Sequence, residues 1–345
     1  MVPMRDVPSI LGRYRGEVED EMRAVIGGRS LPLYDMLRYH LGWLDEHGRP
    51  SEGGAGKGLR PTLCLLACEA VGGDYRVALP AAVAIELAHN FSLIHDDIQD
   101  GDRERRHRPT VWAIWGQAQA INAGDSMHLL SGIALHRLND RGVSAERTLA
   151  VSRVLAEACI EMIEGQYLDL SFENRLDIGV DAYLEMSGKK TGAMIEASIH
   201  IGALLGTDDL ETADRLCRFG RKLGVAFQMQ DDLLGIWGQH EKTGKPLGAD
   251  IRRRKKTLPV VCAFERAEGA DKENLLAIYR RPNVSDVDVD TVLAIFDKVG
   301  AREYTQAMGC SFRRQGVRLL EGLTVAELSR RALGELADFL VAREY

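Results

Sequence analysis

Basic charge excess, long apolar runs and paired cysteines are all scarce in this sequence of 345 residues. Its 44 Lys and Arg residues are outnumbered by 51 Asp and Glu residues, so the formal net charge is -7. Because nucleic acids and anionic membranes are themselves negative, this balance disfavours a general binder of either. We expect no nucleic-acid partner, and an anionic ligand must meet a local cluster of cations.

The six cysteines show no CxxC spacing and lie mostly inside apolar segments, which is typical of reduced core residues in a cytosolic protein. The first residues contain no uninterrupted apolar stretch of the signal-peptide type, and no segment approaches roughly 18 uncharged apolar residues. The expectation is a cytoplasmic protein with no integral membrane segment.

Patterns of alternating polar and apolar residues are hard to find, whereas apolar residues at helical spacing are common. Leu87, Phe91, Ile94 and Ile98 step by four, three and four residues and so line one face of a helix. Breaks rich in Gly, Pro, Asp and Ser fall near Pro32 and at residues 47–58, 72–74, 101–109, 206–209, 238–248 and 282–285. No repeat or Pro-rich linker divides the chain. We predict one all-α domain over residues 1–345, with residues 1–30 as a candidate peripheral helix.

The most informative polar segment is Asp96-Asp97-Ile98-Gln99-Asp100, at the end of an apolar helical stretch and just before a glycine. Asp96 and Asp100 are one turn apart, so their Cβ atoms converge to about 5–6 Å. Such carboxylates repel one another and oppose the helix dipole. Mg²⁺, which takes oxygen ligands and often substrate phosphate oxygens, offsets this cost.

A second acidic pair, Asp231-Asp232, closes the apolar stretch GVAFQMQDD, with Gln228 a turn earlier. A lone DDxxD is more often a solvated helix end, because short motifs recur by chance. Two acidic helix ends that face each other across a pocket can hold a diphosphate through bridging metals.

Cations that suit a diphosphate recur between the apolar helices. Each alone is more often a solvated surface charge. The run from Arg252 to Lys256 is either a solvated face or one lip of an anion site, and we favour the lip. The candidates are Lys57, Arg60, Arg105, Arg106, Lys190, Lys245 and Lys255.

Apolar helices, acidic helix ends and basic loops alternate in one order along the chain. The blocks GKGLRP, ELAHNFSLIHDD, DDIQD with RRHRPT, EGQYLDL, KKTGAM, FQMQDDLLG and GKPLGADIRRRKKTLP together resemble the trans-isoprenyl (polyprenyl) diphosphate synthases over about residues 30–345. The resemblance implies a large helical bundle with a deep central cavity, a homodimer, and condensation of isopentenyl diphosphate with dimethylallyl, geranyl or farnesyl diphosphate. It also implies three Mg²⁺ ions, for which Mn²⁺ can substitute.

By the same resemblance, Asp96, Asp100 and Asp231 bind the metal ions, and Asp97 and Asp232 support them. The remaining roles follow the family. The allylic diphosphate is bound by Arg105, Lys190 and Lys245. The allylic cation is faced by Thr191 and Gln228. The isopentenyl diphosphate site contains Lys57, Arg60, His89 and Arg106, and Lys255 is a further substrate-binding residue.

The chain departs from the family pattern at Gly235, where the second acidic motif usually has its last acid. A glycine that usually precedes Lys255 is also replaced, by Arg254. Two alternatives therefore stay open. A class I terpene cyclase on the same fold has no need of the isopentenyl cluster, which is present here. A non-catalytic subunit of a heteromeric synthase has no need of the intact first acidic motif.

Product length is expected to depend on the helix before Asp96. Phe91 and Ser92 lie five and four residues earlier, roughly 6–7.5 Å along the axis. In the family an aromatic residue at the fifth position often forms the floor of the pocket. With a small Ser92 and no insertion in DDIQD, the pattern resembles geranylgeranyl diphosphate synthases, so we expect a C20 product.

Overall fold

The computed structural model describes residues 9–51, 56, 58–238 and 247–342. Within these ranges the chain is almost entirely helical, which confirms the predicted all-α class. The exception is a hairpin of two short strands, in a segment that the sequence marked only as a break.

The first half of the described chain contains α1 (Ile10–Arg13), α2 (Arg15–Ile26), α3 (Pro32–His40), α4 (Leu59–Ala70), α5 (Tyr75–Gln99), the strands β1 (Glu104–Arg105) and β2 (Arg108–Pro109), α6 (Val111–Trp115), α7 (Gln117–His136), the 3-10 turn η1 (Asn139–Arg141) and α8 (Ala145–Phe172). The strands are antiparallel, with Glu104 opposite Pro109 and Arg105 opposite Arg108.

The second half contains α9 (Val180–Ser187), the π-helical turn η2 (Gly188–Gly192), α10 (Ala193–Gly206), α11 (Leu210–Trp237), α13 (Ala249–Arg252), α14 (Leu258–Arg266), α15 (Gly269–Arg280), α16 (Asp286–Val299), α17 (Ala301–Leu320) and α18 (Glu327–Ala342).

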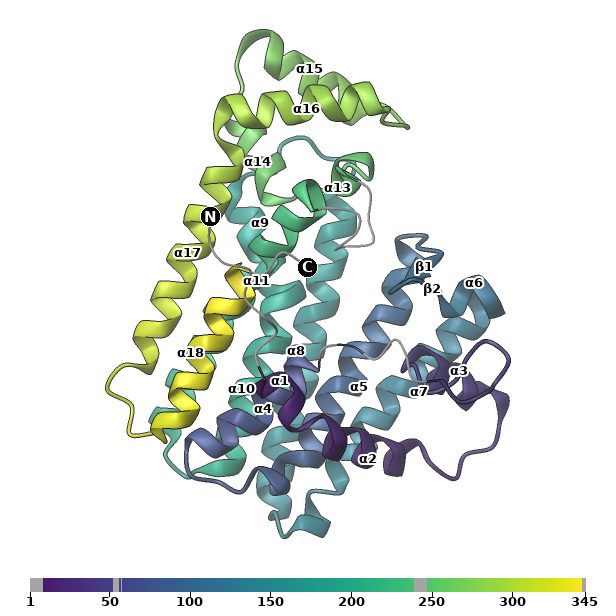
Figure 1. Ribbon diagram of the computed structural model, residues 1–345, viewed down its shortest axis with the longest axis vertical. Helices are drawn as coiled ribbons and strands as arrows, with labels where there is room; N and C mark the ends of the chain where they lie inside the picture. Colours follow the sequence, from purple (N-terminus) through teal and green to yellow (C-terminus); the bar gives the residue numbers. More distant parts are fainter. Residues whose placement is uncertain (1–8, 52–55, 57, 239–246, 343–345) are drawn as a thin grey trace.

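The long helices α5, α7, α8, α10 and α11 run side by side along the long axis of the molecule (Figure 1). Helix α10 lies at the centre of the bundle, where it packs against α4, α5, α8 and α11. Helices α17 and α18 cover α11 on one side, α2 and α3 pack against α7 on the other, and α15 and α16 form a hairpin at one end. The site described below lies between α5, α8 and α11.

Helix α5 is fixed at both ends by its own sequence. At the start, the Asp74 carboxylate accepts a hydrogen bond from the Arg76 backbone N–H at 3.0 Å, as an N-cap does. At the end, Gly101 adopts a φ of 69°, and the Asp102 N–H donates to the Asp97 carbonyl at 2.9 Å, which closes a Schellman motif. The chain therefore reverses directly after Asp100, and the first acidic motif occupies the last turn.

Helix α11 is longer than the sequence indicated. Its N-cap is Asp209, whose carboxylate accepts from the backbone N–H groups of Glu211 and Thr212. The expectation that Asp231 and Asp232 end a helix is wrong, because α11 continues to Trp237. The reason is that the following residues, among them the buried Leu233 and Ile236, keep an apolar stripe in contact with the core.

Within the described ranges, α5 is the one helix long and apolar enough to cross a membrane. The sequence had suggested that no segment came close to this composition. However, 72% of its apolar window is buried inside the protein, which is the burial of a core helix.

The packing of α10 on α4 depends on Gly202. A Cβ atom at this position would lie 2.0 Å from the Cys64 carbonyl oxygen and 2.8 Å from its carbonyl carbon. Because both atoms belong to backbone inside a helix, they cannot turn aside as a side chain can. The close approach of the two helices therefore requires glycine.

We predict that Gly202→Ala lowers the free energy of unfolding by about 1–3 kcal/mol, because the added methyl group forces α10 and α4 apart. Chemical denaturation monitored by circular dichroism measures this. The matched control is Gly132→Ala on α7, where an added Cβ meets no atom within 4 Å; it should stabilise the protein by about 0.4–1 kcal/mol. Equal effects of the two substitutions would contradict the packing argument.

Candidate active site

A cavity of about 720 Å³ lies between α4, α5, the β-hairpin, α8, η2 and α11. Its lining brings together residues that the sequence separates widely. The candidate residues in the lining are Arg60, His89, Phe91, Ser92, Asp96, Arg105, Arg106, Lys190, Thr191 and Asp231. Apolar side chains, among them Met162, Leu170 and Phe227, form the remaining walls.

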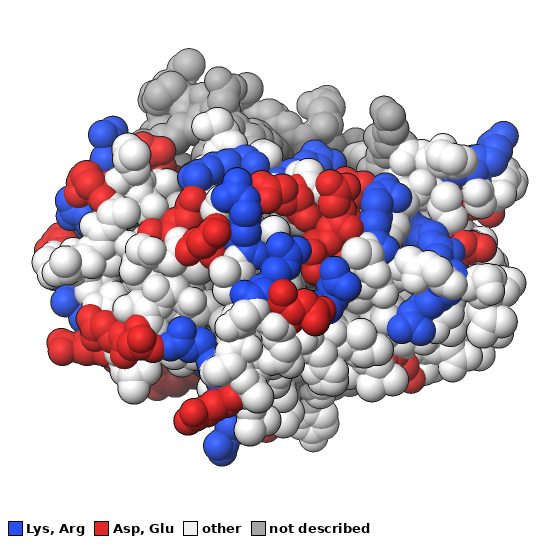
Figure 2. Space-filling model, turned by 90° about the horizontal axis from the view of Figure 1, so that it is seen from below, with Lys and Arg blue, Asp and Glu red and all other residues white. Residues whose placement is uncertain are grey.

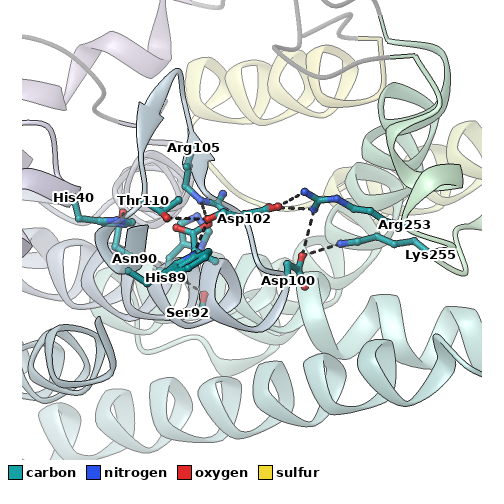
Figure 3. A network of polar contacts seen from close by, with 12 residues as sticks. His40, His89, Asn90, Ser92, Asp100, Asp102, Arg105, Thr110, Arg253 and Lys255 are labelled. Atoms are coloured by element: carbon teal, nitrogen blue, oxygen red, sulfur yellow. Dashed lines mark hydrogen bonds and ion pairs between the residues drawn. The ribbon is translucent and has the colours of Figure 1, made fainter. Parts of the chain in front are cut away.

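The three acids of the first motif have different surroundings. Asp96 lines the cavity, and its carboxylate makes no hydrogen bond or ion pair with the described residues, although the Lys190 charge acts on it. Asp97 is buried behind it and accepts from Arg105 Nε at 2.7 Å. Asp100 faces Lys255, whose Nζ donates to its Oδ2 at 3.0 Å (Figure 3). The last turn of α5 is therefore tied to the hairpin on one side and to the segment after α13 on the other.

These surroundings separate the acidities of the three carboxyl groups. Burial raises the pKa of Asp96, against the opposing effect of Lys190. Burial also raises the pKa of Asp97 to about 6, despite its pairing with Arg105. For Asp100 burial acts in the same direction, but the charges of Lys255 and Lys190 outweigh it and lower the pKa. An added cation would favour ionised Asp96.

The second acidic pair is divided between the cavity and the core. Asp231 lines the cavity. Asp232 is buried and accepts from Gln228 Nε2 at 2.9 Å and from the Leu258 backbone N–H at 2.8 Å. Burial raises its pKa to about 7. Asp232 therefore joins α11 to the start of α14, while Asp231 lines the same cavity as Asp96.

Lys190 and Thr191 reach the cavity because they lie on the π-helical turn η2. Lys190 Nζ donates to Asp169 Oδ2 at 2.6 Å, and Thr191 Oγ1 donates to Gln228 Oε1 at 2.5 Å. A Cβ atom at Gly165 on α8 would lie 2.1 Å from the Lys190 backbone nitrogen, so glycine lets η2 approach. Gln228 thus lies behind Thr191, outside the residues that line the cavity.

Arg60 on α4 and Arg106 in the hairpin turn also line the cavity, and their charges act on His89 of α5. Burial and the charges of these two arginines lower the pKa of His89 well below its usual range, so its imidazole is neutral. Arg106 and His107 both have positive φ, at 53° and 60°, as a two-residue type I′ turn requires. For non-glycine residues this conformation is strained, and such strain often marks functional sites.

Glu86 lies one helical turn before Asn90, whose Nδ2 donates a hydrogen bond to the Glu86 carboxylate. The charges of Arg60 and Arg106 also act on Glu86. Burial raises its pKa. Sequence reasoning did not name Glu86 or Asp169 as site residues, and it named Arg253 only as part of the run from Arg252 to Lys256. The only signal for Glu86 and Asp169 was their place in the blocks ELAHNFSLIHDD and EGQYLDL.

Phe91 is buried and lies on the wall of the cavity, in edge-to-face contact with the His128 ring of α7, their centroids 4.5 Å apart. The neighbouring Ser92 donates to the His89 carbonyl at 2.8 Å. Both residues line the cavity, and Phe91 also fills the packing position that its spacing indicated.

Of the predicted site residues, Lys57 and Lys245 lie outside the described residues. The basic run after α13 is placed in full. Arg253 pairs with Asp102 and Lys255 with Asp100 (Figure 3). Arg252 instead pairs with the exposed Asp286 at 2.7 Å. Lys256 is buried and donates to the carbonyl oxygens of Glu173 and Arg254. On the face seen in Figure 2, basic and acidic side chains are interleaved, with no broad basic patch.

The donor set fits magnesium in the presence of a phosphorylated ligand. Among the residues that the structure describes, no three His, Cys, Asp or Glu side chains gather closely enough to hold a metal ion by themselves. Asp96 and Asp231 nevertheless share one cavity with Lys190. Mg²⁺ commonly takes one or two carboxylates and completes its shell with water and substrate phosphates, so these acids suit it.

Comparison with known proteins agrees with this geometry. The family model described as polyprenyl synthetase matches residues 43–296. The (2E,6E)-farnesyl diphosphate synthase of Mycobacterium tuberculosis is 40% identical over 340 residues, covering 97% of this chain and 93% of that protein. The geranylgeranyl diphosphate synthase of the same organism is 41% identical over 288 residues, covering 83% of this chain and 81% of that protein.

A solved structure, the polyprenyl synthetase from Streptomyces coelicolor A3(2), superposes with a TM-score of 0.90 at 39% identity, covering 98% of this chain and 100% of that one. The helical bundle and its acidic cavity define an enzyme of the prenyltransferase class. The chain belongs to the polyprenyl synthetase family, and the resemblance inferred from its motifs is confirmed.

The buried Asp232 generates a prediction about pH. Because its pKa in the folded protein, about 7, lies above the roughly 3.9 of an unfolded aspartate, the folded state binds the proton more tightly. This contribution to stability is complete below about pH 4 and is lost as pH rises through 7. We predict that the free energy of unfolding in EDTA decreases from pH 5 to pH 8 less steeply in Asp232→Asn than in the wild type. Urea titrations at each pH measure this; parallel pH profiles would show that Asp232 is not the titrating group.

Proposed function

We propose that this enzyme is a magnesium-dependent short-chain trans-prenyl diphosphate synthase that joins an allylic diphosphate to isopentenyl diphosphate. The observation that carries the proposal is that carboxylates from α5 and α11 and four cations, Arg60, Arg105, Arg106 and Lys190, line one cavity with apolar walls. A single diphosphate does not need so many cations, whereas two diphosphates bound in one cavity do. The relatives named farnesyl and geranylgeranyl diphosphate synthases support the same reaction.

The allylic diphosphate binds between the two acidic motifs in this proposal. Asp96, Asp100 and Asp231 hold Mg²⁺, and when bound the metal neutralises the leaving diphosphate. Lys190 and Arg105 contribute fixed charge beside it, and Asp169 and Asp97 orient these two cations. Fixed charges in a water-poor site stabilise a developing anion without reorganising, which favours cleavage of the allylic C–O bond. Three metal ions, Mn²⁺ as a substitute and a part for Lys245 remain predictions.

Isopentenyl diphosphate binds to Arg60 and Arg106, with Lys57 as a further expected contact. Neutral His89 donates or accepts a hydrogen bond there without adding charge. This site orients the double bond of isopentenyl diphosphate toward the allylic cation, which makes the bimolecular step effectively unimolecular. The departing diphosphate then takes the proton, so no side-chain base is required.

The allylic cation needs stabilisation and protection from water. Thr191, with Gln228 behind it, provides the oxygen that faces the cation. The walls formed by Met162, Leu170 and Phe227 keep water away from an intermediate that water would convert to an alcohol.

We also propose a homodimer. Ile163 and Tyr167 on α8 line the cavity but are 55% and 71% exposed, and Ile121, Leu129 and Ile133 on α7 are exposed as well. Exposed apolar side chains beside an active site are a feature of surfaces that a partner covers. A second copy that packs there would close the cavity wall and exclude water.

The proposed product is C20, geranylgeranyl diphosphate. It is supported by the position of Phe91 five residues before Asp96, on the wall and backed by His128. Relatives of nearly equal identity carry C15 and C20 names, so Phe91 and its surroundings, rather than overall similarity, carry this part of the proposal.

Product analysis tests the function directly. The purified protein is incubated with labelled isopentenyl diphosphate, Mg²⁺ and dimethylallyl, geranyl or farnesyl diphosphate in turn, and the products are identified by mass. Elongated prenyl diphosphates support the proposal, with C20 as the expected end point. Cyclic hydrocarbons formed without isopentenyl diphosphate would identify a cyclase instead, and no product in any combination would indicate a non-catalytic subunit.

We predict that Asp96→Ala, and likewise Asp100→Ala, lowers turnover at least about a hundredfold, because loss of such electrostatic stabilisation typically costs on the order of 3 kcal/mol. Metal-free Asp96→Ala should be as stable as the wild type or slightly more so, since a half-buried carboxylate without an ion pair is removed. Steady-state kinetics and thermal unfolding measure both. Asp214→Ala, which removes an α11 carboxylate paired with Arg218 on the outer face, is the control and should keep full turnover. Near-normal turnover in either site variant would refute the metal-bridged mechanism.

We predict that Phe91→Ala extends the product to C25 or beyond, because it opens space beyond the tail, at a stability cost of roughly 3 kcal/mol. Chromatography with mass detection gives the product distribution. Phe296→Ala removes an equally buried ring far from the cavity, in the core around α16, and should cost stability without changing product length. A folded, active Phe91→Ala enzyme with unchanged products would mean that another helix forms the floor.

A further inference from the structure

The π-helical turn η2 is contacted at three points by one face of α11. Arg221, Gly224 and Gln228 follow one another at intervals of three and four residues on α11, so they share a face. Gln228 accepts the hydrogen bond of Thr191. Gly224 lets the two backbones approach, since a Cβ atom there would lie 2.6 Å from Gly192 Cα. The third contact is made by Arg221, which lies outside the residues that line the catalytic cavity.

The Arg221 guanidinium reaches three other elements. Nη1 donates to the Gly188 carbonyl of η2 at 2.7 Å, and Nη2 donates to Glu161 Oε2 of α8 at 2.7 Å. Nε pairs with the Glu196 carboxylate of α10. A planar fork that is always charged can hold several acceptors in fixed directions. Arg221 therefore joins α8, α10 and η2 to α11 at one point.

The Gly188 carbonyl is the acceptor that closes the π-helical turn. It accepts from the Ala193 backbone N–H, five residues later, which is the hydrogen bond of a π-helix rather than of an α-helix. Because a carbonyl oxygen has two lone pairs, Arg221 can bond to it without displacing Ala193. Arg221 therefore orients the carbonyl that distinguishes η2 from the helices on either side.

The form of η2 has a consequence inside the catalytic cavity. Lys190 and Thr191 lie within the turn and line the cavity. Each residue of an α-helix accounts for about 100° of rotation, so a turn that changed to α-helical hydrogen bonds would redirect these side chains. Lys190 would then leave Asp169, and Thr191 would leave Gln228. The directions of both side chains therefore depend on the π-helical form.

Arg221 contacts η2 from a second cavity. Together with Glu161 and Glu196 it lines a space of about 260 Å³ between α8, α10 and α11. Residues of η2 line the catalytic cavity, and the adjoining Ala193 lines this second one. Any effect of Arg221 on the reaction must therefore pass through η2.

We propose that Arg221 is a positioning residue of the active site, which holds η2 in its π-helical form from outside the catalytic cavity and so fixes the directions of Lys190 and Thr191. This inference rests on the proposed function, in which those two side chains act on the allylic diphosphate and the allylic cation. Arg221 itself touches neither substrate. Its loss therefore affects the allylic substrate and spares the site of isopentenyl diphosphate.

The first test is Arg221→Met in the full chain, which keeps most of the side-chain length but removes every donor. Hydrogen–deuterium exchange of the peptide that covers residues 188–193, followed by mass spectrometry on the metal-free protein, reports on η2 without turnover. We expect these amides to exchange at least about tenfold faster than in the wild type, because local opening becomes easier. The matched control is Arg218→Met, one turn earlier on α11, where the arginine pairs with the exposed Asp214. It should exchange as the wild type does.

Steady-state kinetics test the consequence for the reaction. Arg221→Met should raise KM for the allylic diphosphate and lower kcat, which together reduce kcat/KM about 10- to 100-fold, because small displacements of catalytic groups have effects of this size. KM for isopentenyl diphosphate should not change. In a protein that already carries Lys190→Ala and Thr191→Val, Arg221→Met should have little further effect, because the side chains through which it acts are gone.

Unchanged exchange of residues 188–193 in Arg221→Met, equal rises in KM for both substrates, or a full additional loss in the Lys190→Ala and Thr191→Val background would overturn the inference. If Arg221→Met does not fold, Arg221→Lys replaces it. This variant keeps a charge between Glu161 and Glu196 but cannot serve all three acceptors, so the same shifts are expected at smaller size. A wild type that elongates no allylic diphosphate would refute the proposed function, while the exchange measurement still decides whether Arg221 holds η2.

Discussion

Mutual repulsion of carboxylates is the constraint on which this site depends. Asp96, Asp97 and Asp100 share the last turn of α5, and Asp231 faces the same cavity from α11. In the folded protein these carboxylates have different interaction partners. Asp97 pairs with Arg105 and Asp100 with Lys255, whereas the Asp96 carboxylate makes no hydrogen bond or ion pair with the described residues. The hairpin, η2 and the segment after α13 all bring cations to this one region.

Two irregular segments, the turn of the β-hairpin and the π-helical turn η2, bring cations close to the repelling carboxylates. The strained turn at Arg106 and His107 places Arg105 and Arg106 beside α5. The π-helical turn η2, which follows α9, places Lys190 and Thr191 at the cavity. The regular helices supply the apolar walls. The regular helices therefore form the scaffold of the cavity, and the segments that depart from regular helix geometry position cationic side chains in it.

Much of this could be predicted from the sequence, because it depends on local spacing. The helical class follows from apolar residues at intervals of three and four, and the convergence of Asp96 and Asp100 follows from one turn of helix. Gly101 and Pro32 mark a helix end and a helix start where the structure has them. Such features need no knowledge of the partner segment.

The remainder depends on contacts between distant segments. Asp169 lies in the block EGQYLDL, but its pairing with Lys190 depends on the packing of α8 against η2. The sequence of η2 likewise predicts ordinary helix, and the close approach of Gly165 to its backbone is apparent only in the structure. The end of α11 was placed too early because an acidic pair looked like a boundary, while burial of Leu233 and Ile236 carries the helix onward. The contact of Arg221 with the Gly188 carbonyl likewise exists only in three dimensions.

The Schellman motif at Gly101 has a consequence for how such an enzyme can change over time. It fixes the end of α5, so every residue in the preceding turns has a set rotational phase relative to the acidic motif. Inserting or deleting one residue between Phe91 and Asp96 would turn the aromatic ring by about 100° around the helix axis, away from the cavity. Descendants of this chain can therefore vary the cavity by exchanging side chains, while the number of residues between Phe91 and Asp96 stays constant.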